Sequence, residues 1–131
     1  MIGVDSSIII DILRKRINLE KLQKFSEEDL WTTETVVYEL LYGVYFGGEK
    51  IAEKEQQIAA ILDTFTYILP FDRKSAAKAA HIGGNLARAG QMLDHNDTLI
   101  AGSLLAHGCT KFLTKNKRDF ERIKELEVLD L

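Results

Sequence analysis

The feature that most constrains this chain is a regular alternation between short apolar, β-type runs and longer segments of helical periodicity. The runs that predict strands lie at 2–5, 30–33, 67–69, 111–114 and 128–129. The segments that predict helices lie at 8–13, 19–25, 36–46, 49–63, 72–89, 96–107 and 119–126. Strands that alternate with helices need crossover connections, which favour a mostly parallel sheet with helices on both faces. We therefore predict an α/β fold, a three-layer α/β/α sandwich around a mostly parallel sheet.

The size and composition indicate one globular domain over residues 1–131. Hydrophobic residues make up 46% of the chain and charged residues 28%, which excludes an intrinsically disordered protein. The single cysteine, Cys109, rules out an internal disulfide and fits a reducing compartment. No apolar run approaches the roughly 20 residues of a spanning helix, and the start of the chain lacks a signal-peptide pattern. We expect a cytoplasmic protein that does not contact a membrane.

Four acidic side chains fall where such sheets bind their ligands, beyond the carboxyl ends of the strands. Asp5 ends the first predicted strand, and Glu39 lies near the start of the helix after the second. Asp97 lies in the first turn of its helix, and Asp119 follows the strand that ends at Thr114. Carboxylates held together resist ionising unless a cation joins them. Mg²⁺, a hard ion that takes oxygen ligands, suits such a cluster.

Three of these acids also have a structural interpretation. Asp94 or Asn96 could cap the helix that contains Asp97, which would then merely stabilise the positive end of the helix. The same cap-like spacing relates Asn116 to Asp119, and Glu39 could occupy a solvated helix face. Taken singly, Asp97 and Asp119 are explained better by helix capping than by a metal site, and a solvated helix face is the common position of a glutamate.

Asp5 is the acid that local structure explains least. It ends an apolar strand in the middle of the predicted sheet. An ionisable group in that position needs a partner or an ion, because an unpaired buried charge is costly. Of the four acids, Asp5 is the one we favour as functional.

Four segments occur in a recognisable order along nearly the whole chain. They are VDSS at 4–7, ELLYG at 39–43, DTLIA at 97–101 and TKNKRDF at 114–120. Together they resemble the PIN domain family, and in particular its VapC-type toxins. The resemblance implies a three-layer α/β/α fold and a ribonuclease that uses Mg²⁺, with Mn²⁺ as a substitute, to cleave RNA phosphodiester bonds. It also implies the toxin role in a type II toxin–antitoxin system.

The resemblance assigns roles to seven residues of this chain. The acids that match the family's metal-site positions are Asp5, Glu39, Asp97 and, at a more variable position, Asp119. The polar residues that match supporting positions are Ser6, Thr114 and Asn116. We expect Asp5 and Asp97 to be direct ligands, while the other two acids bind directly or through waters. The polar stretch before Asp97 leaves open whether Asp94 belongs to the site or only borders it.

Basic residues occur close to the predicted site. They are Arg14, Lys15 and Arg16 after the first helix, and Lys115, Lys117 and Arg118 around the last acid. They could steer RNA phosphates toward the metal, or they could be ordinary solvated charges. The net charge of −3 argues mildly against a nucleic-acid ligand. This objection is weak, because a bound cation would offset the acids that the sum counts as negative.

An aromatic stripe follows helical spacing beside Glu39, at Tyr38, Tyr42 and Tyr45, and Phe46 comes directly after it. Such a stripe is usually core. However, only one side of a helix can face the sheet, and this helix is apolar over much of its circumference. We therefore suspect a protein interface, either a homodimer or a groove for the antitoxin.

Two other functions remain open at this point. A phosphoacceptor receiver domain also holds Mg²⁺ in an acidic pocket, which Asp5, Asp72 and the pair Thr114-Lys115 could imitate. Such domains place paired acids at the end of the first strand, whereas Ser6 follows here. A catalytically silent PIN scaffold that only binds partners is the second alternative. The presence of all four acids disfavours it, because a retired site would tolerate their loss.

Overall fold

The computed structural model describes residues 1–17 and 19–131, and it contains the predicted alternation of strands and helices. The strands are β1 (Ile2–Val4), β2 (Leu30–Thr33), β3 (Tyr67–Leu69), β4 (Lys111–Leu113) and β5 (Glu127–Leu129). The α-helices are α1 (Ser6–Leu13), α2 (Glu34–Gly47), α3 (Ile51–Leu62), α4 (Arg73–Arg88), α5 (His95–Ala106) and α6 (Lys117–Phe120). A 3₁₀ helix, η1 (Leu19–Phe25), connects α1 to β2.

The five strands form one parallel sheet in the order β3-β2-β1-β4-β5. The first strand is central, and its Gly3 pairs with Trp31 on one side and Phe112 on the other. A Cβ atom at Gly3 would lie 2.6 Å from Cδ2 of Leu104 in α5. The glycine therefore allows α5 to pack closely against the middle of the sheet.

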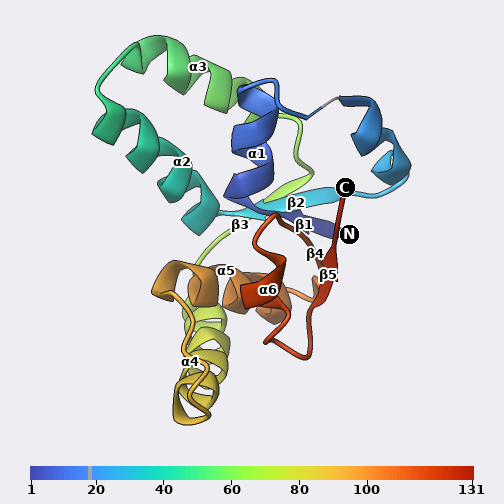
Figure 1. Ribbon diagram of the computed structural model, residues 1–131, viewed down its shortest axis with the longest axis vertical. Helices are drawn as coiled ribbons and strands as arrows, with labels where there is room; N and C mark the ends of the chain where they lie inside the picture. Colours follow the sequence, from blue (N-terminus) through green and yellow to red (C-terminus); the bar gives the residue numbers. More distant parts are fainter. Residues whose placement is uncertain (18) are drawn as a thin grey trace.

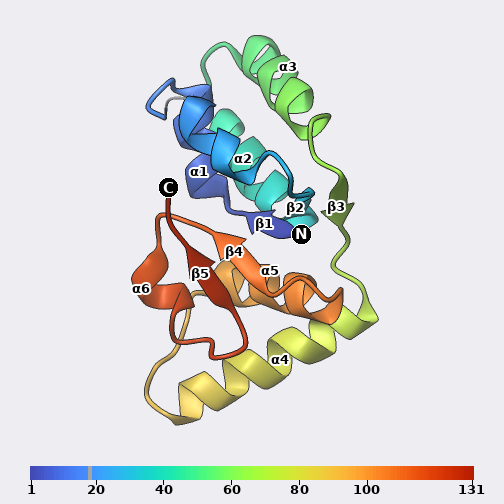
Figure 2. The same ribbon diagram turned by 90° about the vertical axis from the view of Figure 1, so that its right-hand side faces the viewer.

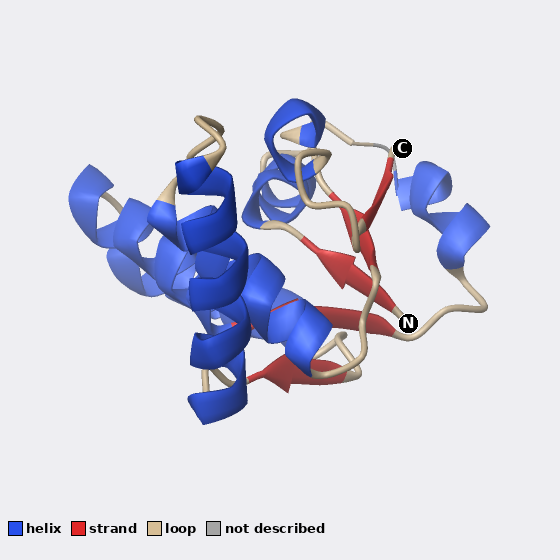
Figure 3. Cartoon of the chain, turned by 90° about the horizontal axis from the view of Figure 1, so that it is seen from below, coloured by secondary structure: helices blue, strands red, loops and turns tan. Residues whose placement is uncertain are grey.

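Helices cover both faces of the sheet, as predicted. Helices α1, α2 and α3 lie on one face, and α4, α5 and α6 lie on the other (Figures 1 and 2). Figure 3 looks onto the sheet from below and shows the strands side by side, partly overlapped by helices. The core on both faces includes the fully buried side chains of Ile9, Ile100 and Phe112. The three-layer α/β/α prediction is confirmed.

The shared direction of the strands brings the carboxyl ends of β1, β2 and β4 to one edge. At this edge Asp5 follows β1 and caps α1, while Thr33 ends β2 and caps α2 through Val36 N. Thr114 follows β4 directly. Residues that are far apart in the sequence therefore meet at one rim of the sheet.

The prediction of a helix over 119–126 is wrong. Helix α6 ends at Phe120, and turns carry the chain to β5 at Glu127. A helix that reached residue 126 would run into a parallel strand with no residues left to turn. Ile123 and Leu126 lie in this turn segment and are buried. Their spacing of three residues resembles that of an amphipathic helix, which explains the wrong prediction. In the part of the chain that the structure describes, no helix is both long enough and apolar enough to span a bilayer.

Candidate active site

Asp5 lies at the centre of the site and is almost fully buried, with 5% of its surface exposed. Its carboxylate caps α1 by accepting a hydrogen bond from Ser6 N at 2.9 Å. The Thr114 hydroxyl donates to Oδ2 at 2.7 Å, and the Ser7 hydroxyl donates to the same oxygen at 3.1 Å. These neutral donors fix the orientation of the carboxylate. They bring no positive charge to it.

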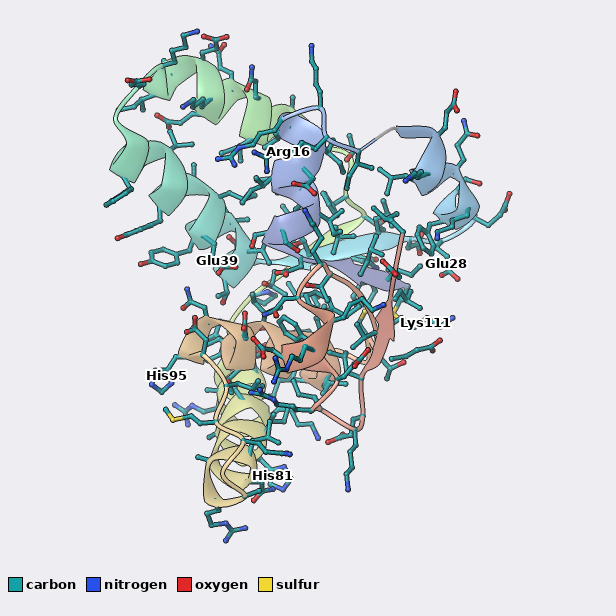
Figure 4. The ribbon with its side chains drawn as sticks, viewed as in Figure 1. Arg16, Glu28, Glu39, His81, His95 and Lys111 are labelled. Atoms are coloured by element: carbon teal, nitrogen blue, oxygen red, sulfur yellow. The ribbon has the colours of Figure 1, made fainter. Side chains whose placement is uncertain are left out.

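Glu39 lies in α2 and is joined to Asp5 through Ser6. The Ser6 hydroxyl donates to Glu39 Oε1 at 3.1 Å, while the backbone N–H of the same serine binds Asp5. Figure 4 shows Glu39 near the end of α2 that faces the start of α5, where His95 is labelled. Asn96 of α5 donates a hydrogen bond to Glu39 from the opposite side. The predicted role of Ser6 as a supporting hydroxyl agrees with this position between two acids.

Asp97 comes from the first turn of α5, as predicted. The Asn116 side chain donates to its Oδ2 at 3.3 Å. Asp94 caps α5 by accepting from Asn96 N at 3.3 Å, so the capping role belongs to Asp94 and leaves Asp97 free for the site. Asn116 is the N-cap residue of α6, as its spacing indicated, but its side chain makes no cap bond there and binds Asp97 instead.

The electrostatics of Asp97 show that the acids are neighbours. Burial, together with the negative charges of Asp5, Asp94, Glu39 and Asp119 in that order of importance, raises the pKa of Asp97 to about 7. Each of these acids therefore lies close enough to oppose the ionisation of Asp97. Asp94 borders the site electrostatically even though it caps a helix.

The ionised forms of Asp5 and Glu39 are also unfavourable in the folded protein. Burial raises the pKa of Asp5 despite the three hydrogen bonds that it accepts. Burial also raises the pKa of Glu39, and the charge of Asp5 adds to the effect. Among the ion pairs between described residues, none involves Asp5, Glu39 or Asp97. The cluster thus has the negative charge and the oxygen donors for a cation.

The donor set fits Mg²⁺ better than an ion that needs a closed protein cage. Within residues 1–17 and 19–131, no group of three or more His, Cys, Asp or Glu side chains is arranged to hold a metal ion by itself. Mg²⁺ commonly uses one or two carboxylates and keeps several waters. Asp5 and Asp97 could supply the carboxylates, with the remaining acids reached through waters. The side chains therefore fit an ion of this kind.

A short loop at 114–116 holds two of the acids. Thr114 Oγ1 donates to Asp5, and the same oxygen accepts from Asn116 N at 3.0 Å. The backbone N–H of Lys115 donates to Ser7 Oγ at 3.1 Å. Ser7 was not among the predicted site residues, although it lies inside the VDSS segment. Its position two residues after Asp5 could have indicated that it contacts the site.

We expect the substitution Thr114→Val to lower kcat for RNA cleavage by about 10- to 100-fold, because outer groups that orient metal ligands have effects of this size. The valine keeps the shape of the threonine but removes the donor to Asp5. The free energy of unfolding should fall by about 1–3 kcal/mol, because the buried hydroxyl makes two hydrogen bonds whose partners are left unsatisfied. Single-turnover cleavage and urea unfolding would measure the two effects.

Thr110→Val provides the matched control, because Thr110 precedes the other end of β4 and is exposed. It should leave both cleavage and stability close to wild type. Equal losses of activity in the two variants would show that Thr114 has no special connection to the site.

The fourth predicted acid, Asp119, lies at the margin of the cluster. Its charge raises the pKa of Asp97, which places it within electrostatic reach. Its Oδ1 also lies 3.4 Å from Nη2 of Arg122, one turn further along. Because Arg122 already offsets its charge, Asp119 is the least suited of the four acids to bind a metal ion.

Three of the six predicted RNA-steering cations have acidic partners. Arg16 Nη1 lies 3.7 Å from Asp11 Oδ1. Lys115 Nζ lies 2.6 Å from Asp11 Oδ2, and Lys117 Nζ lies 3.1 Å from Asp130 Oδ2. Arg118 is exposed and has no ion pair with any residue that the structure describes. Sequence analysis had missed Asp11 as a partner, since it lies in an apolar helix 104 residues away.

A groove of about 280 Å³ extends from Glu39 between α1, α2 and α3. Its apolar wall includes Ile10, Leu40 and Ile58, and its basic lining residues are Arg14 and Lys54. Positive charge therefore lies beside the acidic cluster, and a polyanion that extends from the cluster into the groove could bind there. A larger groove of about 390 Å³ lies between α4 and α5, but none of the clustered carboxylates lines it.

The aromatic stripe on α2 is exposed. We call Tyr38, Tyr42, Tyr45 and Phe46 the aromatic surface. Its rings contact one another, Tyr38 with Tyr42 and Tyr42 with Phe46. Phe46 alone has 82% of its surface exposed. The interpretation of these residues as core is therefore wrong, and the interface prediction is the one consistent with their position.

The receiver alternative required Asp72 to join Asp5. Asp72 instead caps α4, where Ser75 N and Ser75 Oγ donate to its Oδ1 at 3.0 and 2.8 Å. Its other oxygen lies 3.3 Å from Nε2 of His107. The acid that the alternative depends on has a structural role.

The sequence as a whole matches known proteins along most of its length. A family model described as "PIN domain" matches residues 2–126. Ribonuclease VapC2 from Haemophilus influenzae is 31% identical over 124 residues, which cover 92% of this chain and 89% of that protein. The similarity therefore extends over every segment that supplies the site.

Solved structures share the fold. VapBC2 from Rickettsia felis, crystallised with a DNA fragment from the promoter, has a TM-score of 0.88 at 22% identity and covers 100% of this chain and 99% of that chain. VapBC-5 from Mycobacterium tuberculosis, described as a member of the VapBC family of toxin–antitoxin systems, has a TM-score of 0.72 at 20% identity, with coverage of 98% and 97%. At these identities the likeness concerns the fold alone.

Proposed function

Because this chain belongs to the PIN domain family, we propose that it is a Mg²⁺-dependent ribonuclease and the toxin of a toxin–antitoxin pair. The observation that carries the proposal is the cluster formed by Asp5, Glu39 and Asp97, which repel one another and lack a cationic partner among the described residues. The name of the relative from H. influenzae, ribonuclease VapC2, supports RNA as the substrate.

A bound Mg²⁺ or Mn²⁺ would activate a water and offset the charge that develops on the phosphate. Asp5 and Asp97 hold the ion in our proposal, while Glu39 and Asp119 bind it directly or through waters. The donors from Ser6, Ser7 and Thr114 keep Asp5 and Glu39 oriented before the ion arrives. Without a cation the carboxylates would repel a phosphodiester, so the acids alone cannot bind the substrate.

Basic residues near the cluster support the binding of RNA. Arg14 and Lys54 line the groove that begins at Glu39, and Arg118 is exposed on α6. These residues can attract the phosphates of RNA toward the proposed site. Lys115 and Lys117 are less suited to this role than the sequence indicated, because acidic side chains already bind them.

The partner that we expect is an antitoxin. The M. tuberculosis neighbour is described as part of a toxin–antitoxin family, which supports such a pairing. In this chain the aromatic surface offers an exposed apolar patch suited to a protein partner. The homodimer stays a prediction.

The test is cleavage of a fluorescently labelled RNA by the purified protein. We expect cleavage with Mg²⁺ or Mn²⁺, and a rate at least about 100-fold lower in excess EDTA, because the ion supplies the main electrostatic stabilisation. The activity should elute with the protein on size exclusion, which distinguishes it from a contaminant. Cleavage that resists EDTA would contradict the metal mechanism. A protein that binds its antitoxin and cleaves no RNA would favour the silent scaffold.

A further inference from the structure

Asp11 is a buried acid that the proposed chemistry does not use. It lies in α1 on the second turn after Asp5, and only 5% of its surface is exposed. Its Oδ2 accepts from Lys115 Nζ at 2.6 Å, and its Oδ1 lies 3.7 Å from Nη1 of Arg16. A buried carboxylate is costly without a close cationic partner, so its location depends on Lys115 more than on the distant arginine.

Lys115 is the middle residue of the loop that orients the proposed metal ligands. Thr114 before it donates to Asp5, and Asn116 after it donates to Asp97. Its own backbone N–H donates to Ser7 Oγ, which in turn donates to Asp5. The side chain and the backbone of Lys115 therefore both attach the loop to α1.

We propose that Asp11 is a positioning residue whose ion pair with Lys115 fixes the 114–116 loop against α1, and thereby sets the orientation of Asp5 and Asp97. The proposal rests on the proposed function. Both ends of the pair are well placed for this task, because α1 begins at Asp5 and the loop follows the neighbouring strand β4. Lys115 thus contacts α1 at two points, Asp11 through its side chain and Ser7 through its backbone, and Ser7 contacts Asp5.

The burial of the Asp11 carboxylate favours a persistent contact with Lys115. The Asp11 side chain is 7% exposed and that of Lys115 is 55% exposed, so the carboxylate end is shielded from water and salt. The hydrogen bond from Lys115 holds the pKa of Asp11 below its usual value, so the acid is charged in the folded protein. One of the three N–H donors of the ammonium is thereby occupied, and the negative charge of Asp11 offsets its positive charge.

The experiment compares Asp11→Asn, Lys115→Met and Lys115→Arg in the full chain. Each of the first two should lower kcat and weaken Mn²⁺ binding by about 10-fold, the lower end of the range for groups that orient metal ligands. KM for RNA should stay close to wild type. The arginine variant keeps the ion pair and should recover most of the activity and of the Mn²⁺ affinity.

The double variant tests whether the two residues act as one unit. Asp11→Asn combined with Lys115→Met should be no worse than either single change, because both remove the same interaction. The matched control is the exposed pair of Lys78 and Glu125, whose Nζ and Oε2 atoms lie 2.7 Å apart. Lys78→Met and Glu125→Gln should change neither kcat nor Mn²⁺ affinity.

Two results would overturn the proposal. If Lys115→Met raised KM and reduced the salt dependence while Asp11→Asn cleaved RNA normally, the lysine would bind substrate directly. The variants could instead have a lower unfolding temperature but wild-type kcat and Mn²⁺ affinity when assayed well below that temperature. The pair would then be merely structural. Amide hydrogen exchange at Lys115 gives a readout that needs no activity, and it should be faster in Asp11→Asn. A wild-type protein that cleaves no RNA would refute the proposed function, while exchange and Mn²⁺ binding would still decide on the positioning role.

Discussion

Replacing either Asp5 or Asp97 by asparagine is expected to lower kcat/KM for RNA cleavage by roughly 100- to 1,000-fold, the effect of losing one main electrostatic element of an active site. Asparagine keeps the size of the side chain and one oxygen acceptor, but it removes the charge that would hold the ion. Cleavage of labelled RNA under single-turnover conditions would measure the loss.

The same variants should be as stable as the wild-type protein or more stable in the absence of metal. Burial and neighbouring negative charges raise the pKa of Asp97, and burial raises that of Asp5, so the charged forms are unfavourable in the folded state. Asp29→Asn is the matched control, because Asp29 is exposed at the opposite edge of the sheet. Normal cleavage by Asp5→Asn, or equal losses in Asp29→Asn, would contradict the assignment.

Thermal stability without metal is expected to fall as the pH rises from about 4 to about 7. The folded protein raises the pKa of Asp97 from 3.8 to about 7, so in this window the folded state binds more protons than the unfolded state. Such a group stabilises the protein fully below pH 4 and loses that contribution as the pH passes the folded pKa. Calorimetry in EDTA from pH 4 to pH 8 would measure the trend.

Mg²⁺ should reverse this loss at high pH. An ion at ten times its Kd stabilises the folded state by about 1.4 kcal/mol, which corresponds to roughly 5 °C in Tm for a domain of this size. The shift should be much smaller at pH 5, because protons compete with the metal for the same carboxylates. In Asp97→Asn both the pH trend and the Mg²⁺ shift should shrink. An equal Mg²⁺ shift at pH 5 and pH 8 would show that the ion binds elsewhere.

The sheet and the central acid of the site could be predicted because both depend on local patterns. The alternation of β-type and helical segments implied crossover connections and hence a parallel sheet. Parallel strands share one carboxyl edge, so Asp5, at the end of the first predicted strand, was expected there. The family resemblance named Thr114 as a supporting hydroxyl, and its hydrogen bond to Asp5 agrees with that role. The burial of Asp5 followed from its position after an apolar strand in the middle of the sheet.

Partners that depend on tertiary structure could not be predicted. The spacing of Asn116 favoured a helix cap, but its side chain binds Asp97, which only the neighbouring position of α5 makes possible. The bond between Lys115 and Asp11 depends on β4 lying beside β1, a strand order that the sequence did not specify. The exposure of Tyr42 likewise depends on how α2 is rotated against the sheet.

The most direct test of the metal cluster is a calorimetric titration of Mn²⁺ at pH 8 into the wild-type protein, Asp97→Asn and Asp29→Asn. We expect the wild-type protein and Asp29→Asn to bind the ion with equal affinity, and Asp97→Asn to bind it at least about 10-fold more weakly. A wild-type protein that takes up no Mn²⁺, or an Asp97→Asn variant that binds it as tightly, would show that these carboxylates do not share a divalent ion.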